Sequence, residues 1–164
     1  MRRIISGSAV SAVAGLVLLA VVAQAAEKDK KIPLEKVPKA VQDALKARFP
    51  GAEVTSIEKE IEGGAVVYDI ELKHKDTKYE MDIKEDGTVL VIEKEIAAKD
   101  LPDAVSKALK TKYPRATIKE VMEVYTVKGK EEKLDEYEVT ITTADKKSVE
   151  LKVSLDGKNL KEEK

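Results

Sequence analysis

The chain carries one segment twice, at a spacing of 64 residues. Residues 37–50, VPKAVQDALKARFP, return as residues 101–114, LPDAVSKALKTKYP. Self-similarity at a fixed period indicates that one structural unit has been duplicated. The duplication therefore constrains the fold to two copies of a unit that begins with this segment.

Both copies of the segment have the pattern of an amphipathic helix bounded by prolines. Their apolar residues recur at a spacing of three and four, which places them on one helix face. A proline is tolerated in the first turn, where no internal N–H bond is lost. The residue before a proline resists the helical conformation. We therefore predict one helix between Pro38 and Pro50 and a second between Pro102 and Pro114.

After each predicted helix, apolar and polar residues alternate. The clearest runs are residues 68–72 and 79–83 in the first copy, and residues 137–141 and 149–155 in the second. Such alternation is typical of antiparallel strands with one buried face. One further strand is expected before these runs in each copy, over residues 54–61 in the first and residues 118–127 in the second. A strand over residues 88–96, apolar on both faces, is expected near the junction of the copies.

These patterns predict an α+β fold of two tandem units, each with one helix packed on a three- or four-stranded antiparallel sheet. Residues 35–97 form the first repeat and residues 98–164 the second, and residues 27–34 form a flexible leader. The sequence leaves open whether the units share one continuous sheet or form two. It also leaves the oligomeric state open.

Residues 1–26 have the features of a secretory signal peptide rather than of a membrane anchor. Arg2 and Arg3 precede an uncharged run over residues 9–23, which is short for a membrane span of about 20 residues. The run ends in a small-x-small cleavage pattern, Ala23-Gln24-Ala25. We expect cleavage after Ala25 or Ala26, no membrane attachment afterwards, and a periplasmic or secreted location.

Composition excludes several kinds of site. Removal of Arg2 and Arg3 leaves 28 basic and 31 acidic residues, intermixed, which is not the clustered basic surface of a nucleic-acid binder. Without cysteine and with His74 as the only histidine, a Cys/His zinc site is impossible. His74 stands between lysines in a predicted turn, where we expect it to be solvated. We predict no catalytic residue, no metal ligand and no cofactor, and a protein that is not an enzyme.

Acidic residues recur on one face of the predicted strands. Glu58, Glu60 and Glu62 alternate along one strand, and Glu80 and Asp82 along another. Lysines are mixed among them, which favours a ladder of opposite charges on the solvent face of a sheet. The alternative is a small-ligand or divalent-cation site, although the loop spacing of a hard-cation site is absent.

The two copies differ most at their first hairpin, where residues 128–136 lengthen the second copy by five residues. This insertion is expected to be a long polar loop or a protruding ribbon. Segments that depart from a scaffold often carry its function. We therefore expect a protein or peptide partner, of unknown identity, to contact residues near this hairpin, namely Tyr125, Lys128, Lys130, Glu131 and Lys133.

Both copies resemble the PepSY-like repeats of small exported bacterial proteins, which are described as similar to beta-lactamase-inhibitor protein. The resemblance rests on residues 101–105 with 113–114, on residues 37–41 with 49–52, and on residues 68–72 with 79–87. It implies a helix against an antiparallel sheet, used twice. It also implies an exported, non-enzymatic protein with a role in binding or peptidase inhibition.

Overall fold

The computed structural model describes residues 32–163, so the predicted signal peptide and residues 27–31 of the predicted leader lie outside the described residues. Two α-helices and eight strands form the fold. The helices are α1 (Lys39–Arg48) and α2 (Asp103–Lys112). The strands are β1 (Glu53–Glu62), β2 (Ala65–His74), β3 (Thr77–Lys84), β4 (Val89–Glu95), β5 (Thr117–Lys128), β6 (Glu131–Thr142), β7 (Ser148–Ser154) and β8 (Leu160–Glu162). Short 3-10 turns, Leu34–Lys36 and Ala98–Asp100, precede the two helices.

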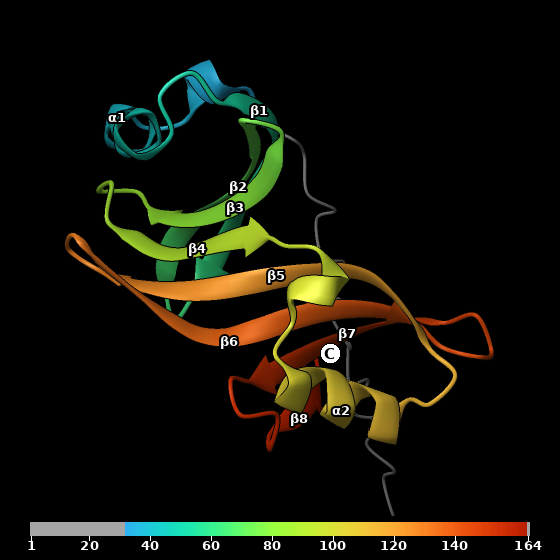
Figure 1. Ribbon diagram of the computed structural model, residues 1–164. Helices are drawn as coiled ribbons and strands as arrows, with labels where there is room; N and C mark the ends of the chain where they lie inside the picture. Colours follow the sequence, from blue (N-terminus) through green and yellow to red (C-terminus); the bar gives the residue numbers. More distant parts are fainter. Residues whose placement is uncertain (1–31, 164) are drawn as a thin grey trace, which may run out of the picture.

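All eight strands form one antiparallel sheet in the order in which they follow along the chain (Figure 1). Strand β4 pairs with β3 on one side and with β5 on the other, where Val91–Glu95 lie opposite Met122–Thr126. The expectation of two units, each with its own three- or four-stranded sheet, is therefore wrong. Strands β4 and β5 would each be an exposed edge in separate sheets, and their pairing satisfies both rows of backbone N–H and C=O groups.

Both helices form between the predicted prolines. Pro38 and Pro102 directly precede the first helical residues, and the helices stop one residue before Phe49 and Tyr113. The N–H groups of Phe49 and Tyr113 each donate to the carbonyl four residues earlier, at 2.8 Å, and the next residue is a proline. The predicted helix boundaries are thus confirmed, because the chain cannot continue in the helical conformation before proline.

Both helices cover the same face of the sheet. Residues that are direct cross-strand neighbours share a face, and the apolar residues of β1–β4 that contact α1 are linked in this way to those of β5–β7 that contact α2. Two buried apolar clusters result. The first contains Val41, Leu45, Ile57, Tyr68, Ile70, Leu72, Met81, Ile83 and Ile92, and the second Val105, Leu109, Val121, Val139, Ile141, Leu151 and Val153.

Residues 128–136 belong to a β-ribbon that extends β5 and β6, which decides between the two expected forms of the insertion. Its base packs on the first copy, since Val127 is buried in the first apolar cluster. At the end of α1, the Arg48 guanidinium pairs with the Glu132 carboxylate and donates to the Gly129 carbonyl at 3.0 Å. The insertion therefore ties the second copy to the helix of the first.

The first described residues pack against the core. Ile32 and Leu34, which fall within the predicted flexible leader, both pack against the first apolar cluster. The Ile32 N–H also donates to the carbonyl of Ile57 on β1, at 2.9 Å. Ile32 and Leu34, at the end of the predicted leader, therefore cover part of the core with their apolar side chains.

The repeated Asp-Gly turns lie against the helices. Gly157 has φ +69°, and a Cβ there would stand 2.5 Å from the Ala104 carbonyl oxygen of α2. Gly87, at φ +87°, has the same relation to Ala40 of α1, at 2.8 Å. Asp156 also accepts a hydrogen bond from the backbone two residues on, at 3.0 Å. Glycine is therefore required at both turns by conformation and by space.

We expect Gly157→Ala to destabilise the protein by about 2–4 kcal/mol, because it combines strain at positive φ with a clash against backbone. Gly129→Ala is the matched control: φ is +64° and no atom lies within 4 Å of its added Cβ. The control should lose only about 1 kcal/mol. Urea unfolding followed by circular dichroism measures both losses. Equal losses would contradict the close packing of turn on helix.

Candidate binding face

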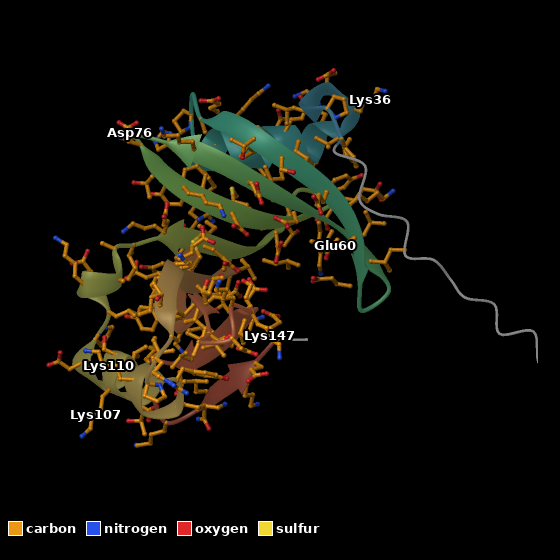
Figure 2. The ribbon with its side chains drawn as sticks, turned by 90° about the vertical axis from the view of Figure 1, so that its right-hand side faces the viewer. Lys36, Glu60, Asp76, Lys107, Lys110 and Lys147 are labelled. Carbon is orange, nitrogen blue, oxygen red and sulfur yellow. The ribbon has the colours of Figure 1, made fainter. Side chains whose placement is uncertain are left out.

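No described helix packs on the second face of the sheet, which we call the open face. Figure 2 shows Lys107 and Lys110 of α2 on the far side of the molecule from Glu60 of β1. The strand register places Glu60 on the open face, directly opposite Val67. The helices therefore hold one face, and the other remains available.

The open face is concave. Glu60 and Glu62 of β1 line the same cavity, of about 180 Å³, as Lys152 of β7 and Glu163, which directly follows β8. Strands β1 and β8 are the two edges of the sheet. In a flat sheet with strands about 4.8 Å apart, these edges would be separated by about 34 Å. The sheet must therefore curl, with the cavity on its inner side.

Acidic side chains face one another across neighbouring strands in the first half of the open face. One row runs Glu58–Asp69–Asp82, and the next runs Glu71–Glu80–Glu93. The expected ladder of opposite charges is therefore wrong in these rows. Like charges directly opposite each other destabilise a sheet, so neither row is explained by the stability of the fold.

Two lysines provide the positive charge close to these rows. Lys78 Nζ lies 2.7 Å from Glu80 and 3.0 Å from Glu120. Lys152 Nζ lies 2.7 Å from Glu163 and 4.0 Å from Glu138. Within residues 32–163, no Lys, Arg or His nitrogen lies within 4.0 Å of Asp69, Asp82 or Glu93. These three carboxylates therefore lack a direct counter-charge.

Burial and mutual repulsion act on the same three carboxylates. Burial, and after it the charge of Asp82, raises the pKa of Asp69 to about 7. Burial and then Glu62 raise the pKa of Asp82 to about 6. Burial and then Glu80 raise the pKa of Glu93 to about 7. The ionised forms of these groups are therefore unfavourable in the free protein.

Apolar side chains and an unpaired oxygen add to the cost of ionisation. Val67, Met122 and Val124 lie on the open face by register and are all buried. One oxygen of Glu93, Oε2, is buried without any hydrogen-bond partner among the described residues. Carboxylates beside apolar groups are poorly hydrated, which strengthens the repulsion between them.

One group of carboxylates in the described part of the chain converges closely enough to hold a metal ion. Oxygens of Glu138, Glu150 and Glu163 lie within 4.8 Å of one another. Burial, followed by the charge of Glu93, raises the pKa of Glu138 well above its ordinary range. Lys152 already contacts this group at 2.7 Å. The group therefore has its own positive charge, and Glu80 and Asp82 are not members of it.

The structure places the predicted contact residues at and near the β5–β6 ribbon. Lys128, Lys130, Glu131 and Lys133 are exposed. Lys133 lies opposite Thr126, which itself lies opposite Val91 in the continuation of the Glu58–Asp69–Asp82 row. Three of the residues therefore border the open face: Lys128, Glu131 and Lys133.

Tyr125 lies on the other, helix-covered face, opposite Ile92. Its hydroxyl donates to Glu123 at 2.8 Å, and burial, followed by this hydrogen bond, raises its pKa to about 12. His74 also lies away from the acidic rows, with its ring centroid 5.6 Å from that of Phe49. Neither side chain belongs to the open face, and the pairing of acid with acid across the strands was not among the features predicted from the sequence.

The sequence contains a signal for these rows, in the alternating acids of residues 69–71, 80–82 and 93–95. The strand register, which the sequence does not reveal, decides whether such residues meet across strands.

A family model described as "Putative beta-lactamase-inhibitor-like, PepSY-like" matches the chain over residues 24–91 and again over residues 77–161. A BLIP-like protein of known structure from Bacteroides fragilis is 26% identical, with a TM-score of 0.53, over 80% of this chain and 86% of that chain. No curated protein matches this chain. The resemblance drawn from the helix and hairpin motifs is thus confirmed.

Two further solved structures share the fold at lower identity. A "putative periplasmic" protein from Bacteroides eggerthii is 13% identical, with a TM-score of 0.56, over 77% of this chain and 88% of that chain. A DUF2874 family protein from Bacteroides uniformis is 14% identical, with a TM-score of 0.56, over 77% and 89%. The first description agrees with the expected periplasmic or secreted location. Within residues 32–163, no helix has the length and apolar character to cross a membrane.

We expect the free protein to be more stable at pH 5 than at pH 8. The carboxyls of Asp69, Asp82 and Glu93 have raised pKa values in the folded state, about 7, 6 and 7. Between about pH 4 and pH 7 the folded state therefore binds more protons than the unfolded state, and the free energy of unfolding falls as pH rises. Urea unfolding at the two pH values measures the difference.

The variant Asp82→Asn should raise the free energy of unfolding at pH 8 by about 1 kcal/mol, a value reduced for partial exposure to solvent, and by less at pH 5. Glu85→Gln, at an exposed turn position, is the control and should change little. A wild-type protein that is less stable at pH 5, or an Asp82→Asn variant that loses stability at pH 8, would contradict the repulsion.

Proposed function

Since the chain belongs to the family of PepSY-like, beta-lactamase-inhibitor-like proteins, we propose that it is an exported, non-enzymatic protein that binds a partner protein on the open face of its sheet. The main support for this proposal is the two acidic rows of the open face, Glu58–Asp69–Asp82 and Glu71–Glu80–Glu93. Facing carboxylates lower the stability of the free protein. A partner that brings positive charge removes that penalty when it binds.

Charge complementarity specifies the partner's surface. The cavity is lined by eight acidic residues, Glu60, Glu62, Asp69, Glu80, Asp82, Glu93, Glu138 and Glu163, and by one basic residue, Lys152. A concave surface of one sign concentrates oppositely charged groups and accelerates their association. The partner is therefore a protein with a basic protruding segment, and its binding weakens as salt concentration rises.

The β5–β6 ribbon forms a second contact in this proposal. Lys128, Glu131 and Lys133 border the open face at one end. Their mixed charges select the orientation of a partner whose basic segment lies over the acidic rows, because like charges placed together at an interface cost binding energy. The ribbon thus contributes to specificity, and the acidic rows to attraction.

Binding of a divalent cation through Glu80 and Asp82 has less support as a function. A calcium site needs six to eight oxygens around the ion at about 2.3–2.6 Å. Glu80 and Asp82 are not part of the one convergent carboxylate group of the described residues. Calcium is therefore a competing ligand that a binding experiment must include as a control.

Site-specific photo-crosslinking tests the proposed face. A photo-reactive residue is placed at Thr126 on the open face, at Lys130 in the ribbon, or at Lys107 on α2. The variants are exposed to envelope extract of the source organism. We expect one discrete product with a basic protein from position 126, reduced at 0.5 M salt, and a weaker product with the same protein from position 130.

The Lys107 variant is the matched control, because this side chain is exposed on the opposite side of the molecule. No product from position 126, or the same product with equal yield from positions 126 and 107, would contradict a binding role for the open face.

A further inference from the structure

We propose that the cavity on the open face is a pocket for one basic side chain, a lysine or an arginine, of the bound partner, with Asp69, Asp82 and Glu93 as acceptors. This inference rests on the proposed function and specifies how the partner is recognised. Three properties of the pocket support it: its size, its acceptors and its lack of a suitable cation.

The size of the cavity fits the end of a side chain. One water molecule needs about 10–15 Å³ of cavity volume measured with a water-sized probe. The cavity has about 180 Å³ on the same measure. It is therefore much larger than a single water site, and it is open to solvent rather than enclosed.

The acceptors come from adjacent strands and point to one side of the sheet. Asp69 on β2 lies directly opposite Asp82 on β3, and Glu80 on β3 lies directly opposite Glu93 on β4. Glu93 Oε2 is buried and has no hydrogen-bond partner among residues 32–163. An unpaired buried carboxylate oxygen is costly, and a donor supplied by a ligand would remove that cost.

A second unpaired polar atom lies on the same row. Ser56 is 6% exposed, and its Oγ has no partner among the described residues. The register places Ser56 opposite Glu71, in the row that continues through Glu80 to Glu93. Ser56 does not line the cavity, so its unpaired hydroxyl lies in the same row of the sheet without adding an acceptor to the pocket.

The arrangement suits an organic cation better than a metal ion. Asp69, Asp82 and Glu93 do not converge within the 4.8 Å that groups Glu138, Glu150 and Glu163. A guanidinium has five N–H donors in a planar fork, and an ammonium has three. Such a group can reach carboxylates on neighbouring strands at once, whereas a divalent ion needs its oxygens in one tight shell.

The charge of Lys152 partly offsets the raised pKa of Asp82 and of Glu93, but this lysine makes its direct contacts elsewhere. Lys152 lines the cavity, but its Nζ contacts Glu163 at 2.7 Å and Glu138 at 4.0 Å. In the described part of the chain, no salt bridge reaches Asp69, Asp82 or Glu93. The raised pKa values of these three groups are consistent with a pocket that lacks its cation in the free protein.

The test uses the peptide acetyl-Gly-Gly-Arg-Gly-Gly-amide as the probe and two-dimensional NMR of the ¹⁵N-labelled protein at pH 7.5. We expect saturable shifts confined to β2, β3 and β4 near Asp69, Asp82 and Glu93. The same peptide with citrulline in place of arginine has similar shape but no charge, and we expect it to bind at least tenfold more weakly.

Two variants locate the acceptors. Glu93→Gln and Asp82→Asn should each weaken the arginine peptide at least fivefold, and both should fold, because each removes repulsion. Glu85→Gln is the matched control and should leave the affinity within twofold. Binding that is unchanged in both pocket variants would overturn the proposal.

Competing ligands separate the remaining explanations. Calcium chloride at 5 mM should compete only weakly; calcium shifts at the same residues with complete loss of peptide binding would assign the pocket to a metal. Spermidine that binds more than tenfold tighter than the peptide would assign it to a free amine. Either result overturns the side-chain pocket.

Crosslinking in the pocket variants separates failure of the pocket from failure of the proposed binding face. If the open face still crosslinks its basic partner from position 126 with undiminished yield in the Glu93→Gln and Asp82→Asn backgrounds, the pocket is wrong and the binding face stands. If no crosslink forms in the wild-type background, the binding face itself is wrong.

Discussion

The backbone pairing of β4 with β5 sets the architecture of the whole molecule. It joins two copies of one unit into a single sheet of eight strands. Only in a continuous sheet can the open faces of both copies form one concave surface, with β1 and β7 lining a common cavity. The Arg48 contacts with the β5–β6 ribbon support the same join from the helix-covered side. The site is therefore a property of the pair of copies, and neither copy contains all of it.

Much of the local structure could be predicted from the sequence, because local physics determines it. Prolines at positions 38, 50, 102 and 114 limit the helices, and the Asp-Gly turns are set by a positive φ and by the space beside Ala40 and Ala104. The single sheet could not be predicted, because the apolar residues of β4 and β5 are equally compatible with strands of two separate sheets or with one strand pair. Strand pairing between copies depends on their whole arrangement, and no short motif encodes it.

The candidate site likewise combines features that the sequence predicts with features that depend on strand pairing. The acidic residues of the strands can be read directly from the sequence, but the strand register determines which of them face one another. Asp69 faces Asp82, and Glu80 faces Glu93, whereas a shift of one residue would have turned each strand's acids to the other face. The insertion at residues 128–136, where the two copies differ most, borders the acidic face and contacts α1 through Glu132. Repetition thus conserves the scaffold, while the surface made by joining the copies is new.

The curled sheet brings poorly hydrated carboxylates without a direct counter-charge together on its open face. The most direct measurement is an NMR titration of the side-chain carboxyl carbons of Asp69, Asp82 and Glu93 in the free protein. We expect apparent pKa values of about 7, 6 and 7, and values that fall toward the ordinary range when a saturating cationic ligand is present. Values near 4 for all three groups in the free protein would contradict this expectation.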